Sequence, residues 1–404
     1  MNLLTDGIEV GGVISTDLSR KITIDGFTKA YKVYKIRLDM LFYNDQNDRI
    51  ATWISQYRSQ HEGQVPSILN KEDYNSIIED FIVKSNPGAI AATQNNIELV
   101  EQREPGVVLA DGRIIDGNRR FTCLRKLADK NDRFKYFEAV ILDRNIENSA
   151  KQIKMLELSI QHGEESKVDY NPIDRLVGVY NDVIDTKLLS ISEYAKSTNE
   201  SENNVNKRVE VAELMVDFLD FINAPKQFYI ARDLQVGGTL EELPVLLKKC
   251  KTEDEKEDFK ISVFTNILMK PASDLRQFVR QIKSIVDSDY VEEFIEEQKE
   301  IAVKVIETLP PVGKVNEKII RDVIRTNDEI SQELERSTEK AITKVKKTET
   351  RNKPVQLVEK ATTFLESIDI NILLKLNDSE LRRVEKQLDK LESVIEEIRG
   401  SIDV

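Results

Sequence analysis

Residues 109–126 (LADGRIIDGNRRFTCLRK) constrain the fold most, because they predict two short strands, a tight turn and a helix in immediate succession. The apolar segments 107–110 and 113–115 are expected to be the strands. Between them stands Asp111-Gly112, a pair typical of a two-residue hairpin turn because both positions tolerate positive φ. The sequence therefore predicts an antiparallel hairpin that leads directly into a helix.

The junction between this hairpin and the helix has the features of a phosphate site. The second strand is expected to end at Asp116-Gly117, and the helix to begin near Asn118. The first N–H groups of a helix have no partner within it and carry the positive end of its dipole, which favours a bound anion. Arg119 and Arg120 can add charge-assisted bonds to phosphate oxygens. A plain turn, with both arginines paired to nearby carboxylates, remains the alternative.

Other periodicities place this unit in a mixed α/β region. Residues 30–38 (AYKVYKIRL) alternate as a strand does, and residues 138–142 (EAVIL) predict a buried strand. Residues 74–83 carry apolar side chains on one helical face, and residues 119–130 are expected to be the helix after the junction. From Asn148 onward helical periodicity dominates, which indicates a domain boundary.

The chain has 404 residues, more than one hydrophobic core normally serves. We expect three regions: an α/β domain at 1–147, a helical domain at 148–308 and a helical region at 314–404. The segments 309–313 (LPPVG) and 343–354 (TKVKKTETRNKP) are predicted to be hinges or linkers. Neither a membrane-spanning apolar run nor a signal-peptide pattern is present, so a cytoplasmic protein is expected.

The counts of reactive residues exclude several kinds of chemistry. Cys123 and Cys250 are the only cysteines, and His61 and His162 the only histidines, so neither a disulfide framework nor a clustered zinc site is expected. Cys123 lies among apolar residues of the predicted helix, which favours a buried thiol over a nucleophile. The net charge of −13 opposes a general attraction to DNA, so any DNA contact must be local.

Residues 188–215 resemble a helix-turn-helix. Ser192 is expected to cap a short helix through Ala195, a polar turn follows near Asn199, and a second helix comes after it. If this unit binds the major groove, the start of the second helix supplies the DNA contacts, namely Ser201, Asn203, Asn204, Lys207 and Arg208. Nearby glutamates weaken the local positive charge, so a purely structural packing role remains the alternative.

The last part of the chain predicts helix association. Apolar residues at 381–398 follow the 3-4 spacing of a coiled-coil seam, and residues 355–368 carry an apolar stripe that can face it. An intrachain hairpin and a homodimer seam both fit this pattern. A basic cluster precedes it and fits either a solvated linker or a phosphate contact; it comprises Lys340, Lys344, Lys346, Lys347, Arg351 and Lys353.

Three motifs together resemble the ParB and sulfiredoxin-like superfamily. The box at 107–126 is similar to its DGxRR motif. Residues 36–50 resemble the family's opening segment, which here contains Asn44, Asn47 and Arg49. Residues 171–175 (NPIDR) look like the NPxE-type start of its helical DNA-binding region. Along the chain the three motifs follow one another in the family's order. The resemblance spans roughly residues 31–215.

The resemblance implies a fold class, a ligand and partners. It predicts an α+β ParB/sulfiredoxin-like domain, followed by an all-α helix-turn-helix and helical, coiled-coil C-terminal regions. It also implies a homodimer that binds DNA, with a pocket for a nucleoside triphosphate, CTP or ATP, and magnesium. The residues expected to bind the nucleotide are Arg49, Gly117, Asn118, Arg119, Arg120 and Gln161.

Two departures from the family limit the chemistry that it implies. CTP-switching members have an ENxQR-like motif, and residues 158–162 retain only Ile160 and Gln161 unless Glu157 supplies the carboxylate. Sulfiredoxin has its nucleophilic cysteine where this chain has Asn118, which excludes that activity.

Whether the chain is an enzyme stays open at this point. A nuclease or a nucleotide-dependent phosphotransferase, in a phage-defence or mobile-element setting, is the alternative to a binding switch, as is an NTPase. Asp116 and Glu157 are its catalytic candidates. A protein-interaction adaptor is a third possibility, which the acidic charge and the helical content favour.

Overall fold

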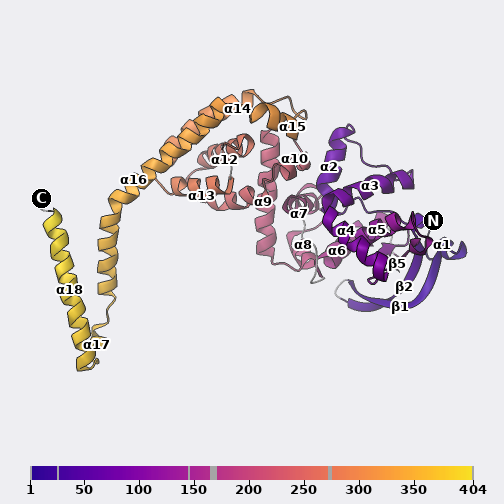
Figure 1. Cartoon of the computed structure of the whole chain (residues 1–404), viewed down its shortest axis with the longest axis horizontal. Helices are drawn as coiled ribbons and strands as arrows, with labels where there is room; N and C mark the ends of the chain where they lie inside the picture. The colour runs from indigo at the N-terminus through magenta and orange to yellow at the C-terminus, as the bar shows by residue number, and fades with distance from the viewer. Residues whose placement is uncertain (1, 25–26, 144–145, 164–170, 272–274, 403–404) are drawn as a thin grey trace. The chain divides into compact units, whose positions relative to one another are not determined.

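The computed structural model describes residues 2–24, 27–143, 146–163, 171–271 and 275–402 (Figure 1). The chain divides into two compact units, Met1–Ile342 and Thr343–Val404. Within the described ranges, every helix is too short or too polar to cross a bilayer.

A five-stranded mixed sheet forms the N-terminal part, with strand order β1-β2-β5-β3-β4. β3 and β5 run parallel, and the other neighbouring pairs run antiparallel. The strands are β1 (Val13–Ile24), β2 (Phe27–Arg37), β3 (Gly106–Leu109), β4 (Ile114–Asp116) and β5 (Tyr136–Leu142). The strands predicted at 30–38 and 138–142 are confirmed as β2 and β5. β1 was not predicted, because most of its side chains on both faces are exposed or half-buried and it lacks strict alternation.

The predicted hairpin is confirmed, but its turn differs from the expected one. Only Gly112 has positive φ (+95°), whereas Asp111 does not. The Leu109 amide donates to the Arg113 carbonyl at 2.9 Å, and the Arg113 amide donates to Asp111 Oδ1 at 2.9 Å. Glycine is required because a Cβ at position 112 would lie 2.4 Å from the Met40 carbonyl oxygen. The hairpin thus closes through a longer loop with one left-handed glycine.

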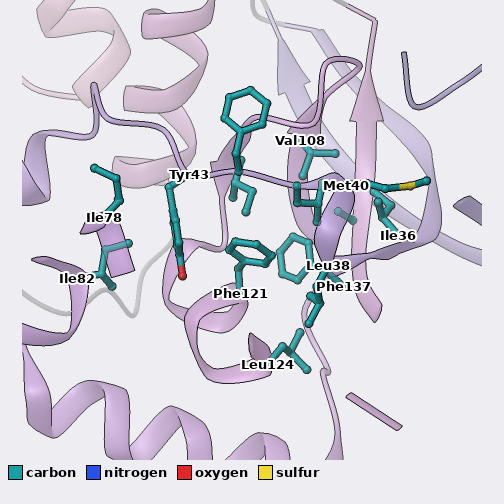
Figure 2. Packing of buried hydrophobic residues seen from close by; sticks show 14 of the residues in the cluster. Ile36, Leu38, Met40, Tyr43, Ile78, Ile82, Val108, Phe121, Leu124 and Phe137 are labelled. Carbon is teal, nitrogen blue, oxygen red and sulfur yellow. The ribbon is translucent and has the colours of Figure 1, made fainter. Parts of the chain in front are cut away.

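Helices cover both faces of the sheet. Tyr43, Phe121 and Phe137 lie in the larger core, where the Tyr43 and Phe121 rings meet edge to face at 4.9 Å (Figure 2). On the other face, Ile153 and Leu156 of α6 pack against the sheet. The helices of this part are α1 (Asp6–Glu9), α2 (Ala51–Gln60), α3 (Lys71–Ser85), α4 (Pro87–Val100), α5 (Asn118–Ala128) and α6 (Ile146–Gly163).

The rest of the first unit is helical, as the periodicity predicted. It contains α7 (Pro172–Val179), a π-helical turn η4 (Tyr180–Asp185), α8 (Ile191–Thr198), α9 (Glu202–Phe221), α10 (Phe228–Asp233), α11 (Gly237–Leu247), α12 (Glu253–Met269), α13 (Leu275–Val286), α14 (Val291–Glu307) and α15 (Glu317–Ile319). The predicted interruption at 309–313 lies between α14 and α15 and is confirmed. The fold class is therefore α+β followed by helices.

The segment 343–354, predicted to be a hinge or linker, begins where the chain divides into its two units. It is helical and lies inside α16 (Asp328–Glu366), which contains Pro354. Lysine, glutamate and arginine favour helix even without an apolar stripe, so a polar helix forms where polarity alone suggested a linker. Of the basic cluster, Lys340 is paired with Glu293 and Glu297.

The second unit continues from α16 into α17 (Ile370–Leu373) and α18 (Asp378–Ile402). The expected cap at the start of α18 is present: Asn377 Oδ1 accepts from the Glu380 amide at 3.0 Å. The predicted seam stays open to solvent, since Leu381 is 41% exposed, Leu388 44% and Ile395 39%. The contacts described within one chain therefore leave this apolar face uncovered.

Candidate functional site

The strand-to-helix junction adopts the geometry that a phosphate cradle needs. Gly117 lies in the left-handed region at φ +104° and stands at the N-cap of α5, where no side chain caps the helix. A Cβ at this position would lie 2.7 Å from the Phe137 ring. The glycine therefore allows both the turn and the close approach to the core, and the first N–H groups of α5 remain without a side-chain cap.

This junction forms one wall of a pocket with a volume of about 310 Å³. The rest of the lining comes from η2 (Asp48–Ile50), the end of α3, α4, the loop at 101–104 and Gln161 of α6. All the residues predicted to bind a nucleotide line it: Arg49, Gly117, Asn118, Arg119, Arg120 and Gln161. The structure thus brings together three segments that lie far apart in the sequence.

The pocket concentrates positive charge around Arg119. Burial lowers the pKa of Arg119, and the nearby guanidinium groups of Arg49 and Arg120 lower it further. Among the residues that the structure describes, no carboxylate pairs with the Arg119 guanidinium. An anion in the pocket would relieve this repulsion, which makes Arg119 the best-placed side chain to bind one.

Arg120 is paired with a carboxylate, as the alternative interpretation of the junction predicted, whereas Asp116 was expected to be a catalytic candidate. Asp116 Oδ2 accepts from Arg120 at 3.1 Å and from Arg20 of β1 at 2.9 Å. Arg120 also donates to the Glu104 carbonyl at 2.7 Å. Two ion pairs therefore hold the Asp116 carboxylate, which favours a role in positioning Arg120 over one as a catalytic acid. Arg20 was missed because only the packing of β1 brings it here.

Asn118 supplies a second polar group to the pocket. Its side chain is 9% exposed, and its Oδ1 has no hydrogen-bond partner among the described residues. An unsatisfied buried polar atom costs free energy, roughly 1–3 kcal/mol, unless a ligand or water satisfies it. The Asn118 amide oxygen is therefore available to accept a hydrogen bond from water or from a polar group of a bound molecule at the start of α5.

Behind the pocket lies a buried polar group of side chains, which we call the junction cluster: Asp48, Lys154, Glu157 and Asp182. Lys154 Nζ lies 2.7 Å from Asp48 Oδ1 and 3.4 Å from Asp182 Oδ2. Burial lowers the pKa of Lys154, but the three carboxyl groups outweigh it and raise that pKa well above its ordinary value. Since one ammonium serves three carboxyls, burial raises the pKa of Glu157 to about 8 and that of Asp182 to about 7.

The junction cluster is connected to the pocket through Gln161. Gln161 Nε2 donates to Glu157 Oε1 at 2.9 Å, and Asn44 Nδ2 donates to Glu157 Oε2 at 3.1 Å. Glu157 is 2% exposed and does not line the pocket, which favours a structural role over a catalytic one. The motif comparison found Asn44 and Glu157. It did not find Lys154, because nothing in the local sequence predicts a buried lysine.

The described part of the chain contains no group of three His, Cys, Asp or Glu residues placed to bind a metal ion. Cys123 is fully buried, as expected from the sequence, and burial raises its pKa to about 11. A thiol with this pKa is protonated at neutral pH and is a poor nucleophile.

The second candidate site consists of α8, α9 and the turn between them. The cap of α8 is Ser190 in a capping box with Glu193, not the expected Ser192. Asn199 has positive φ (+56°), and Ser201 caps α9 by accepting from the Asn204 amide at 3.2 Å. The predicted helix-turn-helix segment therefore does contain two helices joined by a short turn at 199–201.

The predicted DNA contacts differ in their availability. Asn203, Asn204 and Lys207 are exposed at the start of α9. Arg208 is instead held by Glu200 in a bidentate ion pair, with distances of 3.1 and 2.6 Å. Helix α7 begins at Pro172 with Asn171 as its cap, as the NPIDR motif predicted.

The comparisons with known proteins give matches among solved structures only. No protein-family model matches this sequence, and no curated protein matches it. One similar solved structure is described as "Structure of the C2221 form of Pnob8-like ParB-N domain", with a TM-score of 0.32 and 12% identity over 68% of this chain and 98% of that chain. A TM-score this low does not establish a common fold, so the architecture above rests on the strands and helices themselves.

Proposed function

We propose that this chain is a ParB-like DNA-binding protein whose pocket holds the phosphates of a nucleoside triphosphate, CTP or ATP, with magnesium. The observation that carries the proposal is the convergence of Arg49, the Gly117–Arg120 junction and Gln161 on one pocket. These residues resemble the family's phosphate-binding motifs, and two arginines at the start of α5 together with Arg49 of η2 are suited to a polyanion.

The chemistry of the pocket fits this ligand. Its volume of about 310 Å³ is at the lower end of the range for small-molecule sites, roughly 300–1,000 Å³. The uncapped start of α5 and Arg119 would bind phosphate oxygens, and the buried Asn118 amide would meet another polar group of the ligand. Magnesium in such sites keeps several waters and binds mainly through the phosphates, so it needs no cage of carboxylates.

The pocket is also connected to the helices that would bind DNA. Gln161 touches both the pocket and Glu157, while Lys154 joins Asp48 to Asp182 of η4. A phosphate that moves Gln161 would disturb this cluster and hence the packing of α6 against η4. We place the switch there: nucleotide binding changes the arrangement of α7–α9 relative to the sheet.

A homodimer through α18 belongs to the same proposal. Its apolar seam is exposed within one chain, and a second copy would bury it. Light scattering of the full chain tests this directly: a dimer mass supports the seam, and a monomer mass at micromolar concentration contradicts it.

Thermal unfolding with each ribonucleoside triphosphate, with and without magnesium, tests the pocket. A ligand at about 100 times its Kd adds about 2.7 kcal/mol to the folded state, which raises the Tm. Arg119→Gln should reduce that stabilisation to about 0.3–1.3 kcal/mol at the same ligand concentration, because a lost hydrogen bond to a charged group costs about 1.5–3 kcal/mol of binding. Without nucleotide, the variant should unfold at the same Tm or a higher one, since the change removes repulsion among the three arginines.

Lys126→Gln is the matched control. This residue lies on the same helix, does not line the pocket and loses the same charge. The control should keep the full nucleotide-dependent rise in Tm. If no triphosphate shifts the Tm of the unmodified protein, and calorimetric titration gives no heat of binding, the proposal that the pocket binds a nucleotide is wrong.

A further inference from the structure

The hairpin of β1 and β2 extends beyond the sheet. β2 pairs with β5 only from Val33 to Arg37, whereas its pairing with β1 continues to Phe27. The outer part of the hairpin is therefore a two-stranded ribbon at the edge of the sheet (Figure 1).

One face of this ribbon is completely open. The register pairs Lys21 with Ala30 and Thr23 with Thr28, and Lys32 follows on the same face because side chains alternate along a strand. We call these five exposed residues the ribbon face: Lys21, Thr23, Thr28, Ala30 and Lys32. The opposite face packs inward through Ile22, which is 4% exposed.

The ribbon is basic in a strongly acidic chain. Residues 13–37 contain six Lys and Arg against two Asp, whereas the whole chain carries −13. Lys21, Lys29 and Lys32 are exposed, and none of them forms an ion pair with a described residue. Three lysines on a protruding element, without an ion pair to any carboxylate that the structure describes, favour a polyanionic partner.

We propose that the ribbon face binds duplex DNA, with Lys21 and Lys32 on the phosphates. The major groove of B-DNA is wide enough for a two-stranded β-ribbon, whereas that of A-form RNA is too narrow and deep. Small side chains between the lysines let the strands approach the duplex. The Thr23 and Thr28 hydroxyls, 2.8 Å apart, can bond to phosphate oxygens or base edges.

This inference rests on the proposed function, since it requires that the chain bind DNA. It adds a contact that the helix pair does not supply. With Arg208 held by Glu200, the start of α9 has one free cation, Lys207, among its predicted contacts. A second basic element would provide the electrostatic share of the affinity that an acidic protein otherwise lacks.

Fluorescence anisotropy with a labelled mixed-sequence DNA duplex tests the ribbon face, over salt from about 50 to 200 mM. The variant is Lys21→Gln/Lys32→Gln, and the charge-matched control is Lys130→Gln/Lys314→Gln, two exposed lysines without described ion pairs. We expect the ribbon variant to bind about tenfold more weakly or worse, and its salt slope to fall by about two. The control should bind as the unmodified protein does.

A further variant, Lys207→Gln, separates the ribbon from the helix pair. If the ribbon variant binds DNA like its control while Lys207→Gln binds more weakly, the ribbon proposal is overturned and DNA binding through α9 is supported. If only the ribbon variant loses affinity for DNA, the ribbon proposal is supported and Lys207 of α9 does not contact DNA. Absence of salt-sensitive binding by the unmodified protein overturns both, and equal affinity for an RNA duplex overturns the assignment to the major groove.

Discussion

Replacing Lys154 by methionine tests the physical account of the junction cluster. The change keeps much of the side-chain volume but removes the ammonium that lies 2.7 Å from Asp48 and 3.4 Å from Asp182. Lys154 is 5% exposed and Asp48 7%, so solvent cannot replace the lost partner. Removing one partner of a buried ion pair typically costs 3–5 kcal/mol, roughly the scale expected here.

The folded protein can limit this cost by keeping carboxyl groups of the junction cluster protonated. At pH 7, protonating a carboxyl with an ordinary pKa near 3.9 costs about 4 kcal/mol, and at pH 5 about 1.5 kcal/mol. Burial raises the pKa of Glu157 to about 8 and that of Asp182 to about 7, above their unfolded values, and loss of the ammonium raises both further. The stability that remains is therefore fully present below about pH 4 and is lost as pH rises. We therefore expect Lys154→Met to lose about 4 kcal/mol at pH 7 but only about 1.5 kcal/mol at pH 5.

Urea unfolding at both pH values measures this difference, with the single tryptophan as probe. Trp53 of α2 stacks on Arg232 of α10 at 3.8 Å, so its fluorescence reports on packing near the cluster. The control is Lys84→Met, which breaks an exposed ion pair with Asp80 and should cost less than about 1 kcal/mol at either pH. Equal losses at pH 5 and pH 7, or a loss no larger than that of the control, would refute the reasoning.

Two further substitutions test the junction and the seam. Gly117→Ala should lower the free energy of unfolding, measured in urea, more than Gly11→Ala does. Both substitutions impose a left-handed φ on alanine, which costs about 1–2 kcal/mol, but only Gly117→Ala places a Cβ against the Phe137 ring. Equal costs would show that this close approach is not limiting. Leu388→Asp should convert the proposed dimer to a monomer in light scattering, because it places a charge in the apolar seam of α18. An unchanged dimer mass would show that the interface does not include this seam.

The sequence by itself was sufficient to predict the secondary structure around the site. Asp111-Gly112 required a hairpin, and Gly117 followed by a helical segment required a strand-to-helix junction with free N–H groups. These features depend on the φ preferences of single residues and on periodicity over a few neighbours, which are present in any short stretch of sequence. The hairpin and α5 lie where they were predicted.

Only the tertiary structure decided what the charged residues do. Asp116 looked like a catalytic candidate until packing placed Arg20 and Arg120 on its carboxylate, and Arg20 is 96 positions away in the sequence. Lys154 stands 106 positions from Asp48, and no local pattern predicts that they meet.

The same limit explains why β1 was missed and why the helical form of the segment 343–354 was not predicted. β1 leaves most of its side chains exposed, so its sequence lacks the alternation that a half-buried strand shows. Residues 343–354 form helix because of backbone propensity, which polarity does not reveal. Local conformation follows from neighbouring residues, whereas ion pairing and exposure follow from which distant segments pack together, and packing is a property of the whole fold.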